Sequence, residues 1–330
     1  MGKKRCAIFL SAGLMCVLSV LLSLCLGAVR LPLSQLWQAI CRGPNDVAGY
    51  IFWYSRLPRT AACLLSGAAL ACAGCILQNV LGNKLASPGI IGVNAGAGLA
   101  VTVCCAFGTL SGWTVSLASF GGAMIAVLTV VLLARKTGAS RTTVILSGVA
   151  MNSILGALRD GVTALIPDAA MLSGDFRVGG FSSVVSAHLI PAGSLIVAAL
   201  VLALTLCNEL DVLALGEETA QSLGMSVKSV RTTFLLLTAL LAGAAVSFAG
   251  LLGFVGLLVP HMARRLVGSE SRFLLPLSVL MGAGFVTACD LVSRLVFAPY
   301  ELPVGILMSV IGGPFFLILL LDRKGGHSHA

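Results

Sequence analysis

The side chains best able to do chemistry gather in one polar segment, residues 208–231 (NELDVLALGEETAQSLGMSVKSVR). It holds Glu209, Asp211, Glu217 and Glu218, four of the 12 acidic residues in the chain. Carboxylates can act as general acids or bases, bind metal ions or form charge-assisted hydrogen bonds with a partner. No Ser/His/Asp set or metal-ligating cluster accompanies them in the sequence. The segment is therefore either a solvated loop or a docking element for a soluble partner.

A short helix is predicted within this segment, over residues 217–223, because a glycine stands at each end of it. Its first turn holds Glu217 and Glu218, where carboxylates favour the positive end of the helix dipole. Ala220 and Leu223 are three residues apart, so they are predicted to share one face. The segment thus has the features of a small amphipathic helix.

Other candidate ligands argue against ATP, metal or cofactor chemistry in this chain. The phosphate-loop pattern GxxxxGK[ST] is absent, so an ATP-driven activity requires an ATPase on another chain. Cys72 and Cys75 form a CxxC, but a structural zinc needs four ligands and no second pair is present. His261 lies in a predicted helix, where a packing role is favoured over a ligand role. We expect no metal and no cofactor on this chain.

Arginines cluster at one set of predicted span ends. Arg56 and Arg59 belong to RLPR, and Arg294 ends a later span. Pro58 is predicted to begin a helix, with the guanidinium groups of RLPR in solvent. The arginines either anchor the chain at the membrane interface or meet carboxylates on an extracytoplasmic partner. Asp290, one turn before Arg294, is interpreted as its structural ion-pair partner.

Two polar turns lie at the opposite span ends. NKLASPG begins at Asn83, and Arg141, Thr142 and Thr143 open another span. Such turns are either plain connectors or a constriction in a pathway.

The composition is that of a membrane protein. Of the 330 residues, 58% are hydrophobic and only 10% are charged, and the mean hydropathy is +1.04. Soluble domains carry about 25% charged residues. The net charge of +9 does not indicate nucleic-acid binding, because Lys and Arg are scattered between apolar runs.

Uncharged runs of about 20 residues mark helices that can cross a bilayer. About ten are predicted, so the fold class is all-α, a polytopic membrane protein that forms one domain over residues 1–330. Two long runs are divided at Gly-rich breaks, 108–112 and 250–256. Residues 323–330 are predicted to be a flexible tail. The predicted spans are Cys6–Val29, Thr60–Asn83, two within Leu85–Ala134, Thr142 to about Ile166, His188–Cys207, two within Thr232–Ala263, Phe273–Val296 and Leu302–Leu321.

Lys and Arg predict the orientation, because cytoplasmic loops carry an excess of them. An even number of spans places both termini on one side. That side also holds segment 208–231 and most of the basic residues, so it is predicted to be the cytoplasm. The cytoplasmic group is Lys3, Lys4, Arg5, Lys84, Arg135, Lys136, Arg141, Lys228, Arg231, Arg264, Arg265, Arg272, Arg323 and Lys324, against Arg30, Arg42, Arg56, Arg59, Arg177 and Arg294 opposite.

One eight-residue stretch occurs twice, as GAALACAG at 67–74 and as GAAVSFAG at 243–250. By the span count the two copies lie on helices of opposite direction. That arrangement is typical of inverted-repeat transporters, whose pathway lies near the repeat interface. Chance similarity between two Gly/Ala-rich helices is the alternative.

Four longer motifs carry a family resemblance. They are RLPRTAACLLSGAALACAGCILQNVLGNKLASPGIIGVNAGAG, GEETAQSLGMSV, GLLGFVGLLVPHMARRLVG, and ACDLVSR followed by ELPVGILMSVIGGPFFLILL. Together, from about Arg56 to Leu321, they resemble the FecCD-type permeases, the membrane subunits of ABC importers for iron–siderophore, haem and vitamin B12. The chain departs from the family at Lys84, where proline is usual, and at residues 269–272, SESR in place of the common DHR.

The resemblance implies the architecture of a type II ABC importer permease and a set of partners. These are two ABC ATPase subunits that hold ATP and Mg, a second permease copy or paralogue, and an extracytoplasmic substrate-binding protein. Membrane lipid would surround the spans, and no nucleic acid is involved. The residues it implies are Arg56, Arg59 and Arg294 for binding-protein docking, Leu215, Gly216, Glu217, Glu218, Ala220, Leu223 and Gly224 for ATPase coupling, and Asn83, Leu85, Thr142 and Thr143 for a cytoplasmic gate.

The implied function is alternating-access import of an iron chelate across the bacterial cytoplasmic membrane, with no enzymatic activity on this chain. Iron–siderophore is the most frequent cargo of the family, and haem or cobalamin is the alternative. A secondary transporter driven by protons or sodium would share the inverted repeat but need an acid near the midplane. A membrane-embedded enzyme is disfavoured because the sequence shows no catalytic set.

Overall fold

The computed structural model describes residues 2–27, 33–136, 140–296 and 300–325. Within them all regular structure is helical, which confirms the all-α prediction. A π-helical turn, Ile51–Arg56, precedes α4, and a 3-10 turn, Pro88–Ile91, precedes α5. The α-helices are α1 (Gly2–Cys25), α2 (Leu33–Arg42), α3 (Val47–Tyr50), α4 (Leu57–Leu81), α5 (Val93–Ala106), α6 (Gly112–Lys136), α7 (Arg141–Leu165), α8 (Pro167–Leu172), α9 (Gly174–Val178), α10 (Ser186–Thr205), α11 (Cys207–Ala214), α12 (Glu217–Ser222), α13 (Val227–Ala249), α14 (Val255–Val267), α15 (Ser271–Val296) and α16 (Val304–Gly325).

Each predicted span corresponds to one helix: α1, α4, α5, α6, α7, α10, α13, α14, α15 or α16. In the described part of the chain, seven of these helices are long and apolar enough to cross a bilayer. Helix α5 and residues 304–318 of α16 are shorter apolar helices. Helix α14 has 13 residues, with Arg264 and Arg265 in its last turn. Both predicted breaks are confirmed, between α5 and α6 and between α13 and α14.

Two predicted boundaries are wrong. Pro58 does not begin a helix, because α3, the π turn and α4 form one helical run from Val47. Pro58 has no N–H to donate to the carbonyl of Tyr54, and the π turn widens the helix directly before it. Helix α16 continues through Gly325, so the first three residues of the predicted tail are helical. Residues 326–330, like Val29 in the first predicted span, lie outside the described residues.

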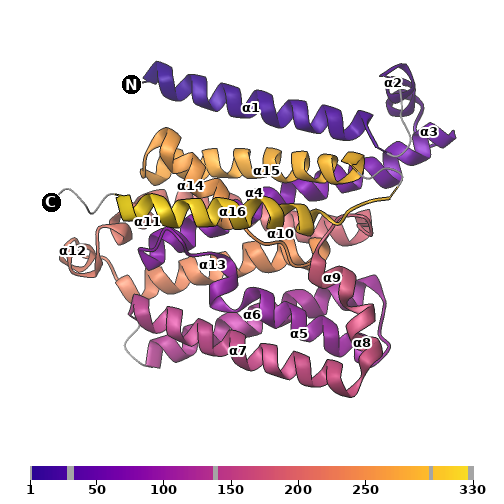
Figure 1. Cartoon of the computed structure of the whole chain (residues 1–330). Coiled ribbons are helices and arrows are strands. Elements are labelled where there is room, and N and C mark those ends of the chain that lie inside the picture. The colour runs from indigo at the N-terminus through magenta and orange to yellow at the C-terminus, as the bar shows by residue number, and fades with distance from the viewer. Residues whose placement is uncertain (1, 28–32, 137–139, 297–299, 326–330) are drawn as a thin grey trace.

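Helices α4 and α13 form the centre of the bundle, and most of their residues are buried. Helix α4 contacts α13, α14 and α15, and α13 contacts α4, α5 and α6; helix α10 packs against both. Figure 1 shows α1 and α7 at opposite edges of the bundle. The two copies of the eight-residue stretch therefore lie on adjacent central helices. Each central helix packs against the helices that follow the other one, which is the reciprocal packing expected of two inverted repeats.

Close packing at this centre depends on glycines. A Cβ atom at Gly67 would overlap the backbone of Gly282 in α15. A Cβ at Gly74 would overlap the backbone of Gly256 in α14. Helices in lipid associate largely through such close approach of small residues. These two crossings fix how α4 lies against its neighbours.

Short helices and connecting segments lie at both ends of the bundle (Figure 1). We call one end the α12 end; it holds α11, α12 and the start of α13. We call the other the α9 end; it holds the π turn, α8, α9 and residues 300–303. Long helices such as α13 and α15 run from one end to the other. The candidate functional residues divide between these two ends.

Candidate functional site

Helix α12 is set apart from the rest of the α12 end by two glycines. Gly216 has a φ of +112° and Gly224 a φ of +82°. Residues with a Cβ rarely adopt such angles, so these glycines allow the sharp bends on either side of the helix. Figure 1 shows α12 projecting beyond the bundle. The predicted Gly-bounded helix is confirmed, although it ends one residue earlier, at Ser222.

The exposed side of this element differs from the predicted one. Ala220 is fully buried, whereas Leu223 is 64% exposed. The prediction that they share one face is wrong, because Leu223 is the C-cap and lies beyond the last helical turn. Leu215, just before the helix, is equally exposed at 64%, and Glu218 is exposed between them. We call Leu215, Glu218 and Leu223 the coupling face.

Glu217 does not belong to this face. Its Oε1 accepts a hydrogen bond from Nη2 of Arg231 at 2.7 Å. Arg231 is only 2% exposed and is the fifth residue of α13. The two acids of the first helical turn therefore have different environments. Glu217 fixes α12 to α13, and Glu218 remains at the surface.

A polar network ties α11 to the long helices. The carboxylate of Asp211 accepts hydrogen bonds from the backbone N of Ser271, at 2.9 and 3.2 Å, where the helix dipole of α15 favours an anion. Ser271 Oγ accepts from Asn79 Nδ2 in α4 at 3.3 Å, and Asn79 Oδ1 accepts from Arg264 Nη2 in α14 at 3.1 Å. No sequence pattern marks this network, because its members lie in four separate segments.

The predicted gate residues lie at the same end. Asn83 Oδ1 accepts a hydrogen bond from the backbone N of Leu85 at 3.0 Å, which shapes the turn after α4. The backbone N of Thr143 donates to Ser140 Oγ at 3.2 Å, so Ser140 caps α7. Thr142 is exposed. Asn83 and Thr143 thus stabilise the turns they stand in, and the two turns lie close enough for Arg141 to reach Gly82.

At the α9 end the predicted arginines are buried, which corrects the expectation that RLPR points into solvent. Arg56 and Arg294 are each 5% exposed, and the side chain of Arg59 is 13% exposed. Arg56 Nη1 donates to the carbonyl of Cys25 at 2.8 Å. Arg294 Nη2 donates to Ser23 Oγ at 2.8 Å. These side chains therefore bind α1 and the segment after it.

Asp290 organises this cluster. It is fully buried, and Arg59 donates to both of its carboxylate oxygens, from Nε at 3.1 and 3.2 Å and from Nη2 at 3.0 Å. Arg294 Nε lies 3.0 Å from Asp290 Oδ2, so the predicted ion pair is confirmed. Arg59 Nη1 also donates to Glu301 Oε2 at 2.7 Å. Because the Glu301 side chain is 37% exposed, the cluster reaches the surface there.

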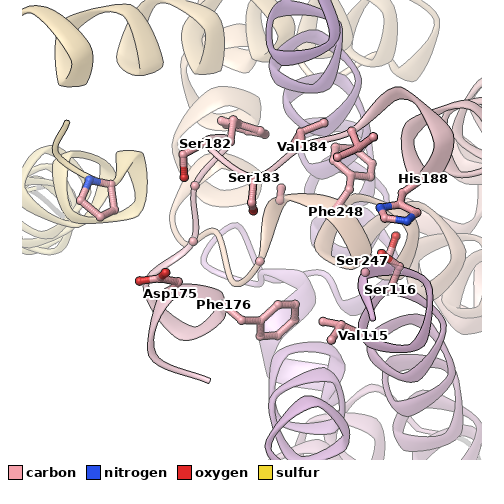
Figure 2. Close-up of a pocket in the computed structure, with 18 of the residues that line it drawn as sticks. Val115, Ser116, Asp175, Phe176, Ser182, Ser183, Val184, His188, Ser247 and Phe248 are labelled. Atoms are coloured by element: carbon pink, nitrogen blue, oxygen red, sulfur yellow. The ribbon is translucent and has the colours of Figure 1, made fainter. Parts of the chain in front are cut away.

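A cavity of about 630 Å³ opens beside this cluster, with Arg59 and Glu301 in its wall. Figure 2 shows His188, Ser116, Ser247 and other side chains that line it. The His188 ring packs edge-on against Trp113, with centroids 4.8 Å apart. Hydroxyl groups and aromatic faces make this lining mixed in character. Among the described residues no group of three or more His, Cys, Asp or Glu side chains is placed to hold a metal ion.

The chain is similar to known permeases over nearly its whole length. The FecCD transport family matches residues 15–322. The hemin transport system permease protein HmuU of Yersinia pestis is 35% identical and covers 96% of each chain. The iron(3+)-hydroxamate import system permease protein FhuB of Bacillus subtilis is 36% identical over 97% of this chain and 84% of its own.

A solved structure agrees with these relatives. It is described as an inward-facing conformation of a metal-chelate type ABC transporter and superimposes with a TM-score of 0.84 at 27% identity, covering 96% of this chain and 99% of its own. The helical bundle, the projecting α12 and the sequence matches point to the same conclusion. The chain belongs to the FecCD transport family, the permease components of ABC importers.

Proposed function

We propose that this permease carries an iron chelate, most often an iron–siderophore, across the bacterial cytoplasmic membrane by alternating access. The names of its relatives support such a cargo, since they include a hemin and an iron(3+)-hydroxamate permease. Haem or cobalamin is the alternative cargo within the same family. The permease does no covalent chemistry, and ATP and Mg bind to a separate ATPase.

The observation that carries this proposal is how α12 is mounted. Its coupling face is exposed, while Glu217 holds it to α13 and Asp211 holds the adjoining α11 to α15. A force on the coupling face is therefore delivered to two helices that run to the α9 end. We assign the α12 end and both termini to the cytoplasm, where ATPases would dock. Closure of two ATPases on ATP would push α12 and rock this permease against a second copy or a paralogue.

The coupling face gives a direct test. Replacing Leu215 and Leu223 with aspartate should lower binding-protein-stimulated uptake at least about tenfold, because it places two charges in the interface and a hot-spot residue is worth about 2 kcal/mol or more, where about 1.4 kcal/mol is tenfold. Co-purification of the ATPase should fall in parallel. Uptake is measured in proteoliposomes that contain the permease, its ATPase and the binding protein.

The matched control is Leu110→Asp, which places the same charge at an exposed leucine in the α5–α6 turn at the other end. This variant should keep the ATPase attached. Wild-type uptake by the Leu215/Leu223 variant would refute the coupling assignment.

We also propose that the α9 end docks the extracytoplasmic binding protein. Of the three predicted arginines, Arg56 and Arg294 would hold the surrounding helices in place, and Arg59 would form an ion pair with the binding protein. A carboxylate of the binding protein would take the place of Glu301, the exposed partner of Arg59. Asp290 would hold the guanidinium in position throughout.

Replacing Glu301 with glutamine should therefore strengthen docking. The change removes the internal competitor, and exposed ion pairs are worth about 0.2–1 kcal/mol, so affinity should rise about 1.4- to fivefold. Surface plasmon resonance on the reconstituted permease measures it. Asp160→Asn neutralises another exposed acid, which pairs with Arg159, and serves as control. Weaker docking of the Glu301 variant would contradict the exchange.

The cargo is tested by uptake from proteoliposomes loaded with ATP. Several ferric hydroxamates and catecholates, haem and cobalamin are offered in turn, each with its binding protein. Uptake of an iron chelate alone supports the proposal, and uptake of only haem or cobalamin overturns the preferred cargo. Uptake that needs a proton or sodium gradient but no ATP would instead indicate a secondary transporter.

A further inference from the structure

The predicted coupling and gate residues converge on Arg141, the first residue of α7. Its Nη2 donates a hydrogen bond to the backbone carbonyl of Leu213 at 3.0 Å. Leu213 lies in the last turn of α11, two residues before Leu215 of the coupling face. Thr142 and Thr143 follow Arg141 directly. The Arg141 side chain therefore links the end of α11, next to the coupling face, to the start of α7, which carries two predicted gate residues.

The same guanidinium group passes beside the other predicted gate turn. A Cβ atom at Gly82 would lie 2.5 Å from Nη1 of Arg141 and 3.3 Å from its Cζ. Gly82 ends α4 with a φ of +60° and directly precedes Asn83. Glycine at this position thus provides both the left-handed turn and the space that Arg141 occupies.

The burial of Arg141 has an energetic cost for the folded state. Its Nε is buried and has no hydrogen-bond acceptor among the described residues. A buried donor without a partner costs about 1–3 kcal/mol, and charged groups cost more.

We propose that Arg141 is a positioning residue that transmits the displacement of α11 and α12 to the predicted gate. This inference rests on the proposed function. When the coupling face is pushed, the carbonyl of Leu213 moves, and the charge-assisted hydrogen bond draws the start of α7 with it. Contact with Gly82 moves the Asn83 turn at the same time. Glu217 holds α12 to α13, and Asp211 holds α11 to α15. The hydrogen bond of Arg141 connects α11 to the predicted gate.

The test measures uptake of the chelate per ATP hydrolysed, in proteoliposomes with the ATPase and binding protein. Arg141→Ala should keep ATP hydrolysis and ATPase attachment but lower this ratio about tenfold, the effect of about 1.4 kcal/mol. Arg141→Lys should give an intermediate ratio, because an ammonium can still donate to Leu213 but lacks the planar fork. Gly82→Ala should lower the ratio with the charge intact, because its Cβ displaces the guanidinium.

Gly108→Ala is the matched control for Gly82→Ala. Gly108 has a similar φ, +69°, but a Cβ there meets nothing within 4 Å. It reproduces the backbone strain without the collision, so the ratio should stay at the wild-type value. A purely structural role of Arg141 would lower the melting temperature and leave the ratio unchanged.

The outcomes separate this inference from the proposed function. If the wild-type complex transports and Arg141→Ala keeps its ratio, the inference is wrong and the proposed function stands. If the wild-type complex neither binds an ATPase nor takes up a chelate, the proposed function itself fails. Should Arg141→Ala not assemble, Arg141→Lys and Gly82→Ala decide: a lowered ratio in either supports transmission, and wild-type ratios in both overturn it.

Discussion

Replacing Asp290 with alanine is expected to lower the free energy of unfolding by about 3–5 kcal/mol, the cost of removing one partner from a buried ion pair. The side chain of Asp290 is 1% exposed; it accepts hydrogen bonds from Arg59 and forms an ion pair with Arg294. Without it, two buried guanidinium groups would face each other at the α9 end with no carboxylate between them. The variant should melt far below wild type, or fail to fold, when thermal unfolding is followed in detergent.

An exposed ion pair supplies the control. Asp160 pairs with Arg159 at 2.8 Å, but its side chain is 67% exposed. Such pairs contribute about 0–1 kcal/mol, so Asp160→Ala should melt close to wild type. Equal melting temperatures for the Asp290 and Asp160 variants would show that the buried cluster does not stabilise the fold.

The second large effect is expected for Gly74→Leu. Its Cβ would overlap the backbone of Gly256, which cannot move aside as a side chain can. Overpacking usually costs about 1–3 kcal/mol, and a collision with backbone belongs at or above the upper end. Separation of α4 and α14 would also break the hydrogen bond from Gln78 Nε2 to the carbonyl of Gly256, now 3.2 Å long. We expect both a lower melting temperature and loss of uptake.

Gly156→Leu tests whether the lower melting temperature comes from the close packing at Gly74 or from the glycine-to-leucine change itself. Gly156 lies within α7, and a Cβ there meets nothing within 4 Å. The same substitution should be tolerated or slightly stabilising, because leucine favours a helix by about 1 kcal/mol over glycine. The explanation from close packing would fail if both leucine variants melted at the same temperature.

Much of the fold could be predicted because lipid imposes simple rules on sequence. Spans must be apolar and about 20 residues long, so charged residues mark their ends. Glycines marked the two breaks and the ends of α12, since φ angles such as that of Gly216 exclude most other residues. The pair Asp290–Arg294 was also accessible, because residues four apart share one helix face.

The contacts of the other arginines could not be predicted. Arg59 binds an acid 231 residues away, and Arg231 binds one 14 residues away across a bend. A long basic side chain at a span end suits solvent, lipid headgroups or a buried acid equally well. The choice depends on which helices become neighbours. The sequence did hold one indication of the buried contacts, Asp290, because an acid within a span requires partners. Which residues are those partners depends on the tertiary structure.

Helices α4 and α15 cross in close contact at Gly67 and Gly282, and this crossing is a point about which α15 could tilt. Helix α15 has 26 residues, and Gly282 lies near its middle, with arms of about 17 and 21 Å on either side at 1.5 Å per residue. One of these two segments begins at Ser271, whose backbone N donates to Asp211, and the other carries Asp290. A helix that tilts about such a point moves its two ends in opposite directions. In the alternating access proposed above, such opposed motion at the two ends would let one gate close while the other opens.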